Sequence, residues 1–290
     1  MEYVNLIIDH NSNKTDRLFT YGSELAGLKP GDKVSVLFSA GNTKKDAYVH
    51  SVTDEVDGKI RGLKYVLEKD PDIFVSPEAL RVAEWMHEHY FCRHIDALKC
   101  FLPAGKAGKK AYTEFKCEED IFQKTPPPVL TGEQAKAVER ILPFLHRKSA
   151  HSFLIHGVTS SGKTEIYMNV IGETIEMGRT AIMLVPEISL TPQTIQRFVL
   201  RFGKENIAVM HSKLSQRERF GEWMRIRRGE VKIVIGARSG VFAPLRDIGV
   251  IVIDEEHEAT YKSDMTPRYS TSEVAHRIAG EHGAVVIMGS

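Results

Sequence analysis

The chain has 290 residues, and its 39 Lys and Arg residues nearly balance its 38 Asp and Glu residues, leaving a formal net charge of +1. This length and a 42% apolar content suffice for two domains, but the near-neutral total excludes a general basic field, so any nucleic-acid contact must come from local patches. Three separated cysteines without a C-x-x-C pair argue against a disulfide framework or a cysteine zinc site within this chain, and no apolar run approaches the length of a membrane span.

Residues 1–104 are predicted to form a small β-rich domain closed by a helix. The turn residues Lys29-Pro30-Gly31-Asp32 precede an alternating, half-buried strand. Ser76 is the expected N-cap of the helix, with Pro77 and Glu78 in the first turn. The apolar face of this helix is expected to contain Leu80, Ala83, Met86 and Tyr90. The expected strands are Val4–Ile8, Lys33–Phe38, Ala47–Val52 and Gly62–Leu67.

Residues 105–129 differ in composition from the segments on either side. The early part contains several glycines and lysines, and the late part contains Pro126-Pro127-Pro128. This composition predicts a linker, with one weak strand at Tyr112–Phe115.

Residues 130–290 alternate between apolar runs and helical patterns. Runs that are apolar at nearly every position predict strands buried on both faces, as in a parallel sheet covered by helices. We therefore expect an α/β doubly wound domain. The expected strands are Phe153–Ile155, Ala181–Val185, Lys232–Ile235, Val250–Ile253 and Ala284–Met288, and the expected helices are 164–177, 192–202 and 215–228.

The segment Gly157–Thr164 matches the pattern G-x-x-x-x-G-K-[ST]. It follows a predicted strand and begins a predicted helix, as a phosphate-binding loop requires. The glycines let backbone N–H groups point at phosphate oxygens, and the helix dipole favours negative charge there. Lys163 would neutralise the β- and γ-phosphates of ATP, and Thr164 would offer its hydroxyl to Mg²⁺. The alternative is a glycine turn without a ligand.

A second polar segment, Asp254-Glu255-Glu256-His257, ends an apolar strand. Ligands of open α/β sheets bind at the carboxyl ends of the strands. Asp254 is expected to hold Mg²⁺ through water, and Glu255 to orient and deprotonate the attacking water. In isolation this segment could equally be a charged loop, but a phosphate loop upstream favours the catalytic interpretation.

Together these segments resemble the DExH-box helicases of superfamily two. The intervening Leu184–Gln193, Met210-His211-Ser212 and Val234–Pro244 extend the resemblance to the replication-restart helicase family of primosomal protein N′, PriA. The resemblance is dense over 131–290 and looser over 1–103. It implies a helicase lobe with a RecA-like parallel sheet, preceded by a domain that binds a DNA 3′ end.

The resemblance also implies an activity and partners. The intact protein would be an ATP-dependent 3′ to 5′ DNA helicase of the bacterial cytoplasm, acting at stalled forks and single-stranded/duplex junctions. Its implied partners are primosome proteins, single-stranded DNA-binding protein and the loader of the replicative helicase. The alternatives are a non-enzymatic module that binds fork DNA through residues 1–103, and another superfamily-two DNA translocase.

Further site residues follow from the resemblance. Gln134 would lie near the adenine, although Thr131-x-x-Gln134 also forms a capping box. Arg238 and Ser239 would contact the DNA backbone, unless Arg238 only stabilises the fold. The expected contacts in an aromatic-rich loop, some of which stack on bases, are Tyr261, Lys262, Arg268 and Tyr269. The two tyrosines could instead be packed aromatics.

Two other clusters suggest function less strongly. A basic run over 217–228 is more typical of a solvated helix face than of a DNA contact. A metal is suggested by His87, Glu88, His89, Cys92 and His94. However, His87 and His89 point to different helix faces, and no second ligand pair is near. We therefore expect no metal there.

The sequence departs from the family in three places. The usual Phe-Asp-Tyr of the 3′-end pocket is Phe19-Thr20-Tyr21 here, which leaves Phe19 and Lys64 as the expected contacts. A winged-helix domain is usual in the family between the end-binding domain and the motor, and here we expect it to be absent or reduced to the short linker. The chain stops at Gly289-Ser290, where a Gly-Ser-Ala-Thr motif is expected. We therefore expect a fragment that lacks the second motor lobe with its arginine fingers and the family's zinc region, the only place where zinc is expected.

Overall fold

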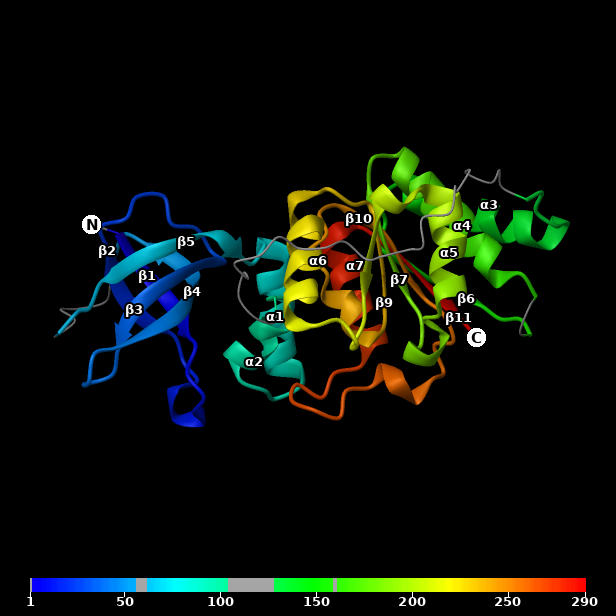
Figure 1. Cartoon of the computed structure of the whole chain (residues 1–290). Coiled ribbons are helices and arrows are strands. Elements are labelled where there is room, and N and C mark those ends of the chain that lie inside the picture. The colour runs from blue at the N-terminus through cyan, green and yellow to red at the C-terminus, as the bar shows by residue number, and fades with distance from the viewer. Residues whose placement is uncertain (1, 56–61, 104–127, 159–160) are drawn as a thin grey trace. The chain divides into compact units, whose positions relative to one another are not determined.

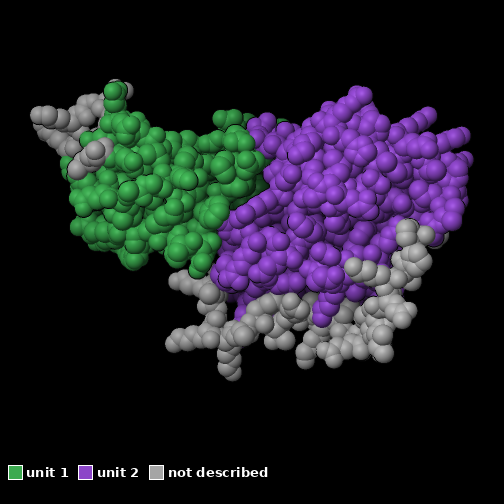
Figure 2. Space-filling model, turned by 90° about the horizontal axis from the view of Figure 1, so that it is seen from above, with its two compact units in different colours: residues 1–102 green, residues 103–290 purple. Residues whose placement is uncertain are grey.

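The computed structural model describes residues 2–55, 62–103, 128–158 and 161–290. The chain divides into two compact units, residues 1–102 and 103–290, which Figure 2 colours green and purple. Most of the predicted linker, including the Tyr112–Phe115 strand and Cys117, lies outside the described residues, as do Thr159 and Ser160 of the phosphate loop.

The first unit contains a five-stranded antiparallel sheet of order β2-β1-β4-β3-β5. One face packs around the buried side chains of Val4, Leu6, Val34, Val36 and Val49. The helices follow the sheet in sequence. The elements are β1 (Glu2–Ile8), β2 (Phe19–Ser23), β3 (Asp32–Phe38), β4 (Thr43–Thr53), β5 (Val66–Phe74), α1 (Pro77–His89) and α2 (His94–Lys99).

Two predictions for this unit were incomplete. Strand β2 was not predicted, because Phe19–Ser23 is short and contains a glycine. The predicted strand Gly62–Leu67 is wrong in its bounds, because pairing with β3 begins at Val66 and continues to Phe74. Pro71 obscured this strand in the sequence, and it is tolerated because β5 is an edge strand of the sheet.

Helix α1 begins where the capping pattern predicts. The Ser76 hydroxyl accepts a hydrogen bond from Ala79 N at 3.2 Å, which satisfies one free donor of the first turn. Leu80, Ala83 and Met86 are buried. Tyr90 does not extend this face, because it is the C-cap residue.

The second unit is a six-stranded parallel sheet of order β6-β11-β10-β7-β9-β8. The sheet lies between α3, α4 and α5 on one side and α6 and α7 on the other (Figure 1). This confirms the predicted α/β fold. The strands are β6 (His151–Ile155), β7 (Thr180–Leu184), β8 (Ile207–Met210), β9 (Ile233–Gly236), β10 (Ile248–Ile253) and β11 (Val285–Gly289). The helices are α3 (Gly132–His146), α4 (Lys163–Glu176), α5 (Pro192–Phe202), α6 (Gln216–Arg228) and α7 (Thr271–His282).

Strand β6 differs from the prediction of a strand buried on both faces. It lies at the edge of the sheet, and Leu154 is 62% exposed. Its neighbour β11 separates it from β10, so the phosphate loop and the acidic segment follow strands that are not adjacent. The spacing of apolar runs cannot reveal this order, because strands in parallel sheets need not pair in sequence order.

Among the described residues, no helix combines the length and the apolar character that crossing a membrane would require.

Candidate nucleotide and DNA sites

A cleft of about 590 Å³ opens at the carboxyl ends of the parallel strands. Its lining includes Gly157, Lys163 and Thr164 from the phosphate loop and Asp254 and Glu255 from the acidic segment. The two polar segments therefore meet in one cavity, although β11 separates their strands. The two predicted segments also contribute Val158, Ser161, Gly162 and His257 to the lining. The lining residues that the sequence did not identify are Arg197, Glu258 and Ser290.

Local chemistry explains the shape of the phosphate loop. Gly162 has φ of +87°, a left-handed conformation that glycine adopts without strain. Its carbonyl accepts a hydrogen bond from Gln134 Nε2 at 3.1 Å, and a Cβ atom on Gly162 would lie 2.2 Å from that nitrogen. The Lys163 amine donates to the carbonyls of Gly157 and Val158. Helix α4 begins at Lys163, so its first N–H groups face the cleft.

Gln134 forms the predicted capping box and also contacts the phosphate loop. Its Oε1 accepts from Thr131 N at 2.9 Å, and the Thr131 hydroxyl accepts from Gln134 N at 3.3 Å. Its Nε2 reaches Gly162, so both ends of the side-chain amide are occupied. Gln134 thus joins the start of α3 to the phosphate loop, a connection that the sequence did not indicate.

Asp254 is held on three sides. Its backbone N–H donates to Leu184 O at 2.9 Å, its carbonyl accepts from the Tyr261 hydroxyl at 2.8 Å, and its Oδ1 accepts from the Tyr167 hydroxyl at 3.1 Å. Burial, followed by the charge of Asp254, raises the pKa of both tyrosines. Both phenols therefore stay protonated and act as donors.

Glu255 adopts φ of +49°, which is uncommon for a residue with a side chain and costs roughly 1–3 kcal/mol. Ser189 Oγ donates to Glu255 Oε2 at 3.4 Å. This contact connects the segment after β7 to the carboxylate, and the sequence did not predict it. A divalent cation prefers oxygen ligands, and the cleft supplies them from Thr164 and Asp254 beside the cationic Lys163. The donor set therefore fits a magnesium–triphosphate pair.

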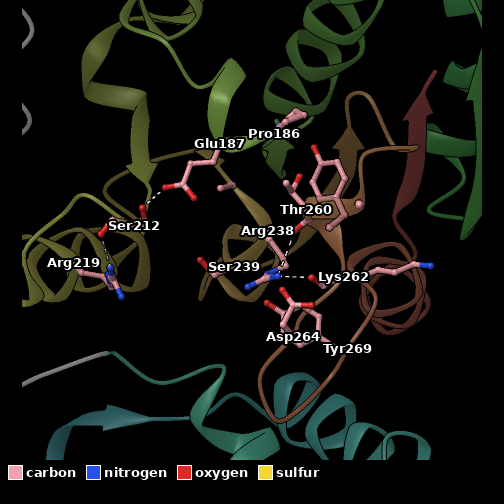
Figure 3. A pocket seen from close by; sticks show the side chains of 13 residues that line it. Pro186, Glu187, Ser212, Arg219, Arg238, Ser239, Thr260, Lys262, Asp264 and Tyr269 are labelled. Atoms are coloured by element: carbon pink, nitrogen blue, oxygen red, sulfur yellow. Dashed lines mark hydrogen bonds between the residues drawn. The ribbon is translucent and has the colours of Figure 1, made fainter.

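A second cavity, of about 530 Å³, contains several of the predicted DNA contacts. Its lining includes Arg238, Ser239, Lys262 and Tyr269 (Figure 3). Tyr261 also lines this cavity. The Arg238 guanidinium donates to the carbonyls of Thr260 and Lys262, whereas the Lys262 amine extends away from Arg238 (Figure 3). Arg268 is exposed on the same loop but is not among the lining residues.

The two tyrosine rings of this loop are too buried to stack on bases as expected. Tyr261 is 5% exposed and Tyr269 is 7% exposed. Tyr269 packs edge-on against Phe242 with centroids 4.9 Å apart, and Tyr261 contacts the acidic segment. Neither ring offers a free face to a base in this structure, which agrees with packed aromatics.

In the first unit, the predicted end-binding residues lie near the end of β3. The Phe19 ring packs edge-on against Phe38 at 5.1 Å, and the Lys64 amine donates to Ser39 O at 2.6 Å. Arg17 lies over Phe19 at 5.0 Å from the ring centroid. Thr20 donates to Asn5 Oδ1 at 2.8 Å, so its side chain is occupied by a contact across β1 and β2.

Asp16, which the sequence did not suggest, joins two histidines of the suspected metal cluster. His94 Nδ1 lies 3.0 Å from Asp16 Oδ1, which also accepts from His94 N at the start of α2. The His87 ring stacks on His94 with centroids 3.5 Å apart, and its Nδ1 contacts Cys92 O. These contacts fix the start of α2, and they also bring one potential metal-ligand atom from each of Asp16, His87 and His94 within 4.8 Å of the others.

The basic run over 217–228 lies on α6. Arg225 pairs with Glu222 at 3.1 Å, and Arg219 donates to Ser212 O at 3.2 Å. Arg227 is largely buried over the Trp223 ring. These residues are therefore engaged in folding contacts rather than forming a uniform solvated face.

A glycine-rich loop and an acidic strand end that line one cleft of a parallel sheet define a lobe of the P-loop nucleotide-binding class. A family model described as DEAD/DEAH box helicase matches residues 131–288. The chain belongs to this family. A second family model, described as a 3′ DNA-binding domain, matches residues 5–103.

Curated relatives confirm the resemblance to the replication-restart family. The chain is 50% identical over 173 residues to replication restart protein PriA of Bacillus subtilis, covering 60% of this chain and 21% of the relative. It is 36% identical over 242 residues to the protein of the same name from Treponema pallidum, covering 83% and 36%. The chain thus spans about a fifth to a third of the length of these relatives. A solved structure of RecG bound to a three-way DNA junction matches 57% of the chain with 22% identity and a TM-score of 0.44.

Proposed function

We propose that this chain provides the ATP-binding lobe and a DNA-end-binding domain of a replication-restart helicase that unwinds DNA 3′ to 5′ at stalled forks. The observation that carries the proposal is the single cleft shared by Lys163, Thr164, Asp254 and Glu255. In this assignment Mg²⁺ neutralises charge on the phosphates. Lys163 binds the β- and γ-phosphates, and Asp254 helps to hold the metal through water.

Hydrolysis is assigned to Glu255. Its carboxylate lines the cleft, and the contact with Ser189 restricts its orientation. It would orient a water molecule and accept its proton. Charge on the transferred phosphoryl group also calls for an arginine, which in this proposal comes from a second lobe. The chain by itself should therefore bind nucleotide and hydrolyse it slowly.

Nucleotide binding by the chain itself tests this assignment. We expect Lys163→Ala to weaken binding of a fluorescent ATP analogue with Mg²⁺ by at least about tenfold, because a charge-assisted contact contributes roughly 1.5–3 kcal/mol. Lys136→Ala is the matched control, since this lysine of α3 is exposed and does not line the cleft. Equal affinities for the Lys163 variant and the control would refute the assignment.

The DNA contacts are proposed on separate grounds. The match to a 3′ DNA-binding domain supports end recognition by residues 5–103, with Phe19 and Lys64 as contacts. Arg238, Ser239, Lys262 and Arg268 are proposed to bind the DNA backbone along the second cavity and its loop. Tyr261 and Tyr269 would then act by shaping this loop. Primosome proteins, single-stranded DNA-binding protein and the helicase loader remain the proposed partners, in the bacterial cytoplasm.

A fork-binding module without motor activity is the second candidate, and the same domain match favours it. Fluorescence anisotropy of the whole chain, without nucleotide, can compare a fork bearing a free 3′ hydroxyl with one bearing a 3′ phosphate. End recognition predicts weaker binding to the blocked fork, and equal binding to both forks by Phe19→Ala/Lys64→Ala. Indifference of the unaltered chain to the 3′ phosphate would contradict it. A chain that recognises the end but binds no nucleotide would favour the module.

A further inference from the structure

Tyr167 is a buried tyrosine whose hydroxyl contacts the proposed metal-holding carboxylate. It lies on α4, one helical turn after Lys163, and is 0% exposed. Its hydroxyl donates to Asp254 Oδ1 at 3.1 Å. The phenol is the donor of this bond, because an ionised carboxylate can only accept. One oxygen of Asp254 is therefore engaged from the protein interior, while the residue also lines the nucleotide cleft.

Gly289 preserves the space in which this contact forms. A Cβ atom at Gly289 would lie 1.9 Å from the Tyr167 hydroxyl oxygen and 2.9 Å from Asp254 Oδ1. Both distances are shorter than atoms tolerate, so any side chain at this position must displace the phenol or the carboxylate. Gly289 ends β11, the strand that separates β6 from β10. The glycine thus allows a helix that starts at the phosphate loop to reach an aspartate two strands away.

We propose that Tyr167 is a positioning residue for magnesium binding. Its hydroxyl holds Oδ1 of Asp254 and so orients the carboxylate with Oδ2 available to the metal and its water ligands. Groups that hydrogen-bond to metal-binding carboxylates fix their orientation, and their loss typically lowers metal affinity. The bond also joins α4 to the strand end that carries the acidic residues. This inference rests on the proposed nucleotide site.

A purely structural role is the alternative, because the Tyr167 ring is part of the hydrophobic core with Ile141, Ile171 and Ile287. The two roles differ in what removing the hydroxyl changes. A core residue affects stability and all ligands alike. A positioning residue affects the additional affinity that Mg²⁺ gives to the nucleotide.

The test measures the dissociation constant of a fluorescent ATP analogue twice for each variant, with excess Mg²⁺ and with EDTA, using the whole 290-residue chain. The ratio of the two constants reports the contribution of the metal. We expect Tyr167→Phe to reduce this ratio roughly tenfold while leaving the EDTA constant nearly unchanged. Gly289→Ala should reduce it as well, because the added methyl separates the same two groups while the hydroxyl is retained.

Thr174→Val is the matched control. Thr174 is buried on the same helix, and its hydroxyl donates to Val170 O at 2.7 Å, so the nearly isosteric change removes a buried hydroxyl away from Asp254. We expect its ratio to equal that of the unaltered chain, with thermal melting used to compare the folding of all variants.

The outcomes separate the two proposals. An unchanged ratio in Tyr167→Phe, or in Gly289→Ala should the tyrosine variant fail to fold, overturns the positioning role while the nucleotide site stands. An equal loss in Thr174→Val also overturns it, because the effect then follows from any weakening of α4. If the unaltered chain fails to bind the analogue both in excess Mg²⁺ and in EDTA, the proposed nucleotide site is refuted. The positioning role is then refuted with it.

Discussion

Gln134 offers a quantitative test of how the phosphate loop is supported. Gln134→Ala removes the bond from Oε1 to Thr131 N and the bond from Nε2 to Gly162 O, at 2.9 and 3.1 Å. Each such bond contributes about 0.5–1.5 kcal/mol net. The Thr131 cap to the backbone of residue 134 remains, because it does not use the glutamine side chain. The expected loss of unfolding free energy is therefore about 1–3 kcal/mol.

Thr131→Ala tests the helix cap apart from the two bonds of the Gln134 side chain, both of which it retains. It removes the hydroxyl that caps α3 at 3.3 Å and leaves the contact with Gly162 intact. We expect it to cost about 1 kcal/mol of stability, as cap losses usually do, with little effect on nucleotide affinity. Urea unfolding of the second unit gives the stability, and competition against a fluorescent analogue gives the affinity.

Gln134 could support the phosphate loop or contact the adenine base, and the dependence of binding on the base distinguishes these two roles. Both ends of its side-chain amide are hydrogen-bonded within the protein. Gln134→Ala should therefore weaken the binding of ATP, GTP and tripolyphosphate by the same factor, because a loosened phosphate loop affects only the contacts with phosphates. A contact with adenine predicts instead a loss confined to ATP. An ATP-specific loss would refute the support role derived from these contacts.

Two further outcomes concern stability. Arg179 is 1% exposed and donates to Asp247 Oδ1 at 2.9 Å, Ile248 O at 2.6 Å and His282 O at 2.7 Å. Arg179→Met should lower the unfolding free energy of the second unit by at least about 2 kcal/mol, because two carbonyls lose their buried donor and each such loss costs about 1–3 kcal/mol. Urea unfolding followed by Trp223 fluorescence in a Trp85→Phe background measures this loss. Burial lowers the pKa of His211, so the folded protein favours its neutral form. The resulting contribution to the free energy of unfolding is complete above about pH 6.5, the pKa in the unfolded chain, and is lost as pH falls through the folded pKa. The urea midpoint of His211→Gln should therefore fall less between pH 7.5 and 5 than that of the unaltered chain, and equal falls would contradict this origin.

The sequence predicted those parts of the fold that depend on local pattern. The Ser76 cap, the Thr131 capping box and three helices of the second unit lie where spacing placed them, because these signals act within a few residues. Strand β8 and helix α7 were not predicted. β8 has four residues, and its apolar run Ile207–Met210 is too short to distinguish a strand from a buried turn.

The site was predictable where a motif carries its own chemistry. Lys163 and Asp254 were identified because phosphate and metal binding need particular residues in a particular order. Tyr167 and Ser189 were not identified, since their importance comes from contacts across the sheet that no local spacing reveals. The helical spacing of Tyr167 from Lys163 was a signal, but apolar core residues share that spacing. Tyr261 was placed on the surface because an aromatic in a polar loop looks the same in sequence whether its ring is exposed or buried.

A crystal structure of the chain with Mg²⁺ and a non-hydrolysable ATP analogue tests the central claim most directly. We expect a β- or γ-phosphate oxygen within about 3 Å of Lys163 Nζ and Mg²⁺ about 2.0–2.1 Å from the Thr164 hydroxyl, with Asp254 reaching the metal through water. A triphosphate bound outside this cleft, or one that contacts Lys163 while its metal lies beyond the reach of Asp254, would contradict it.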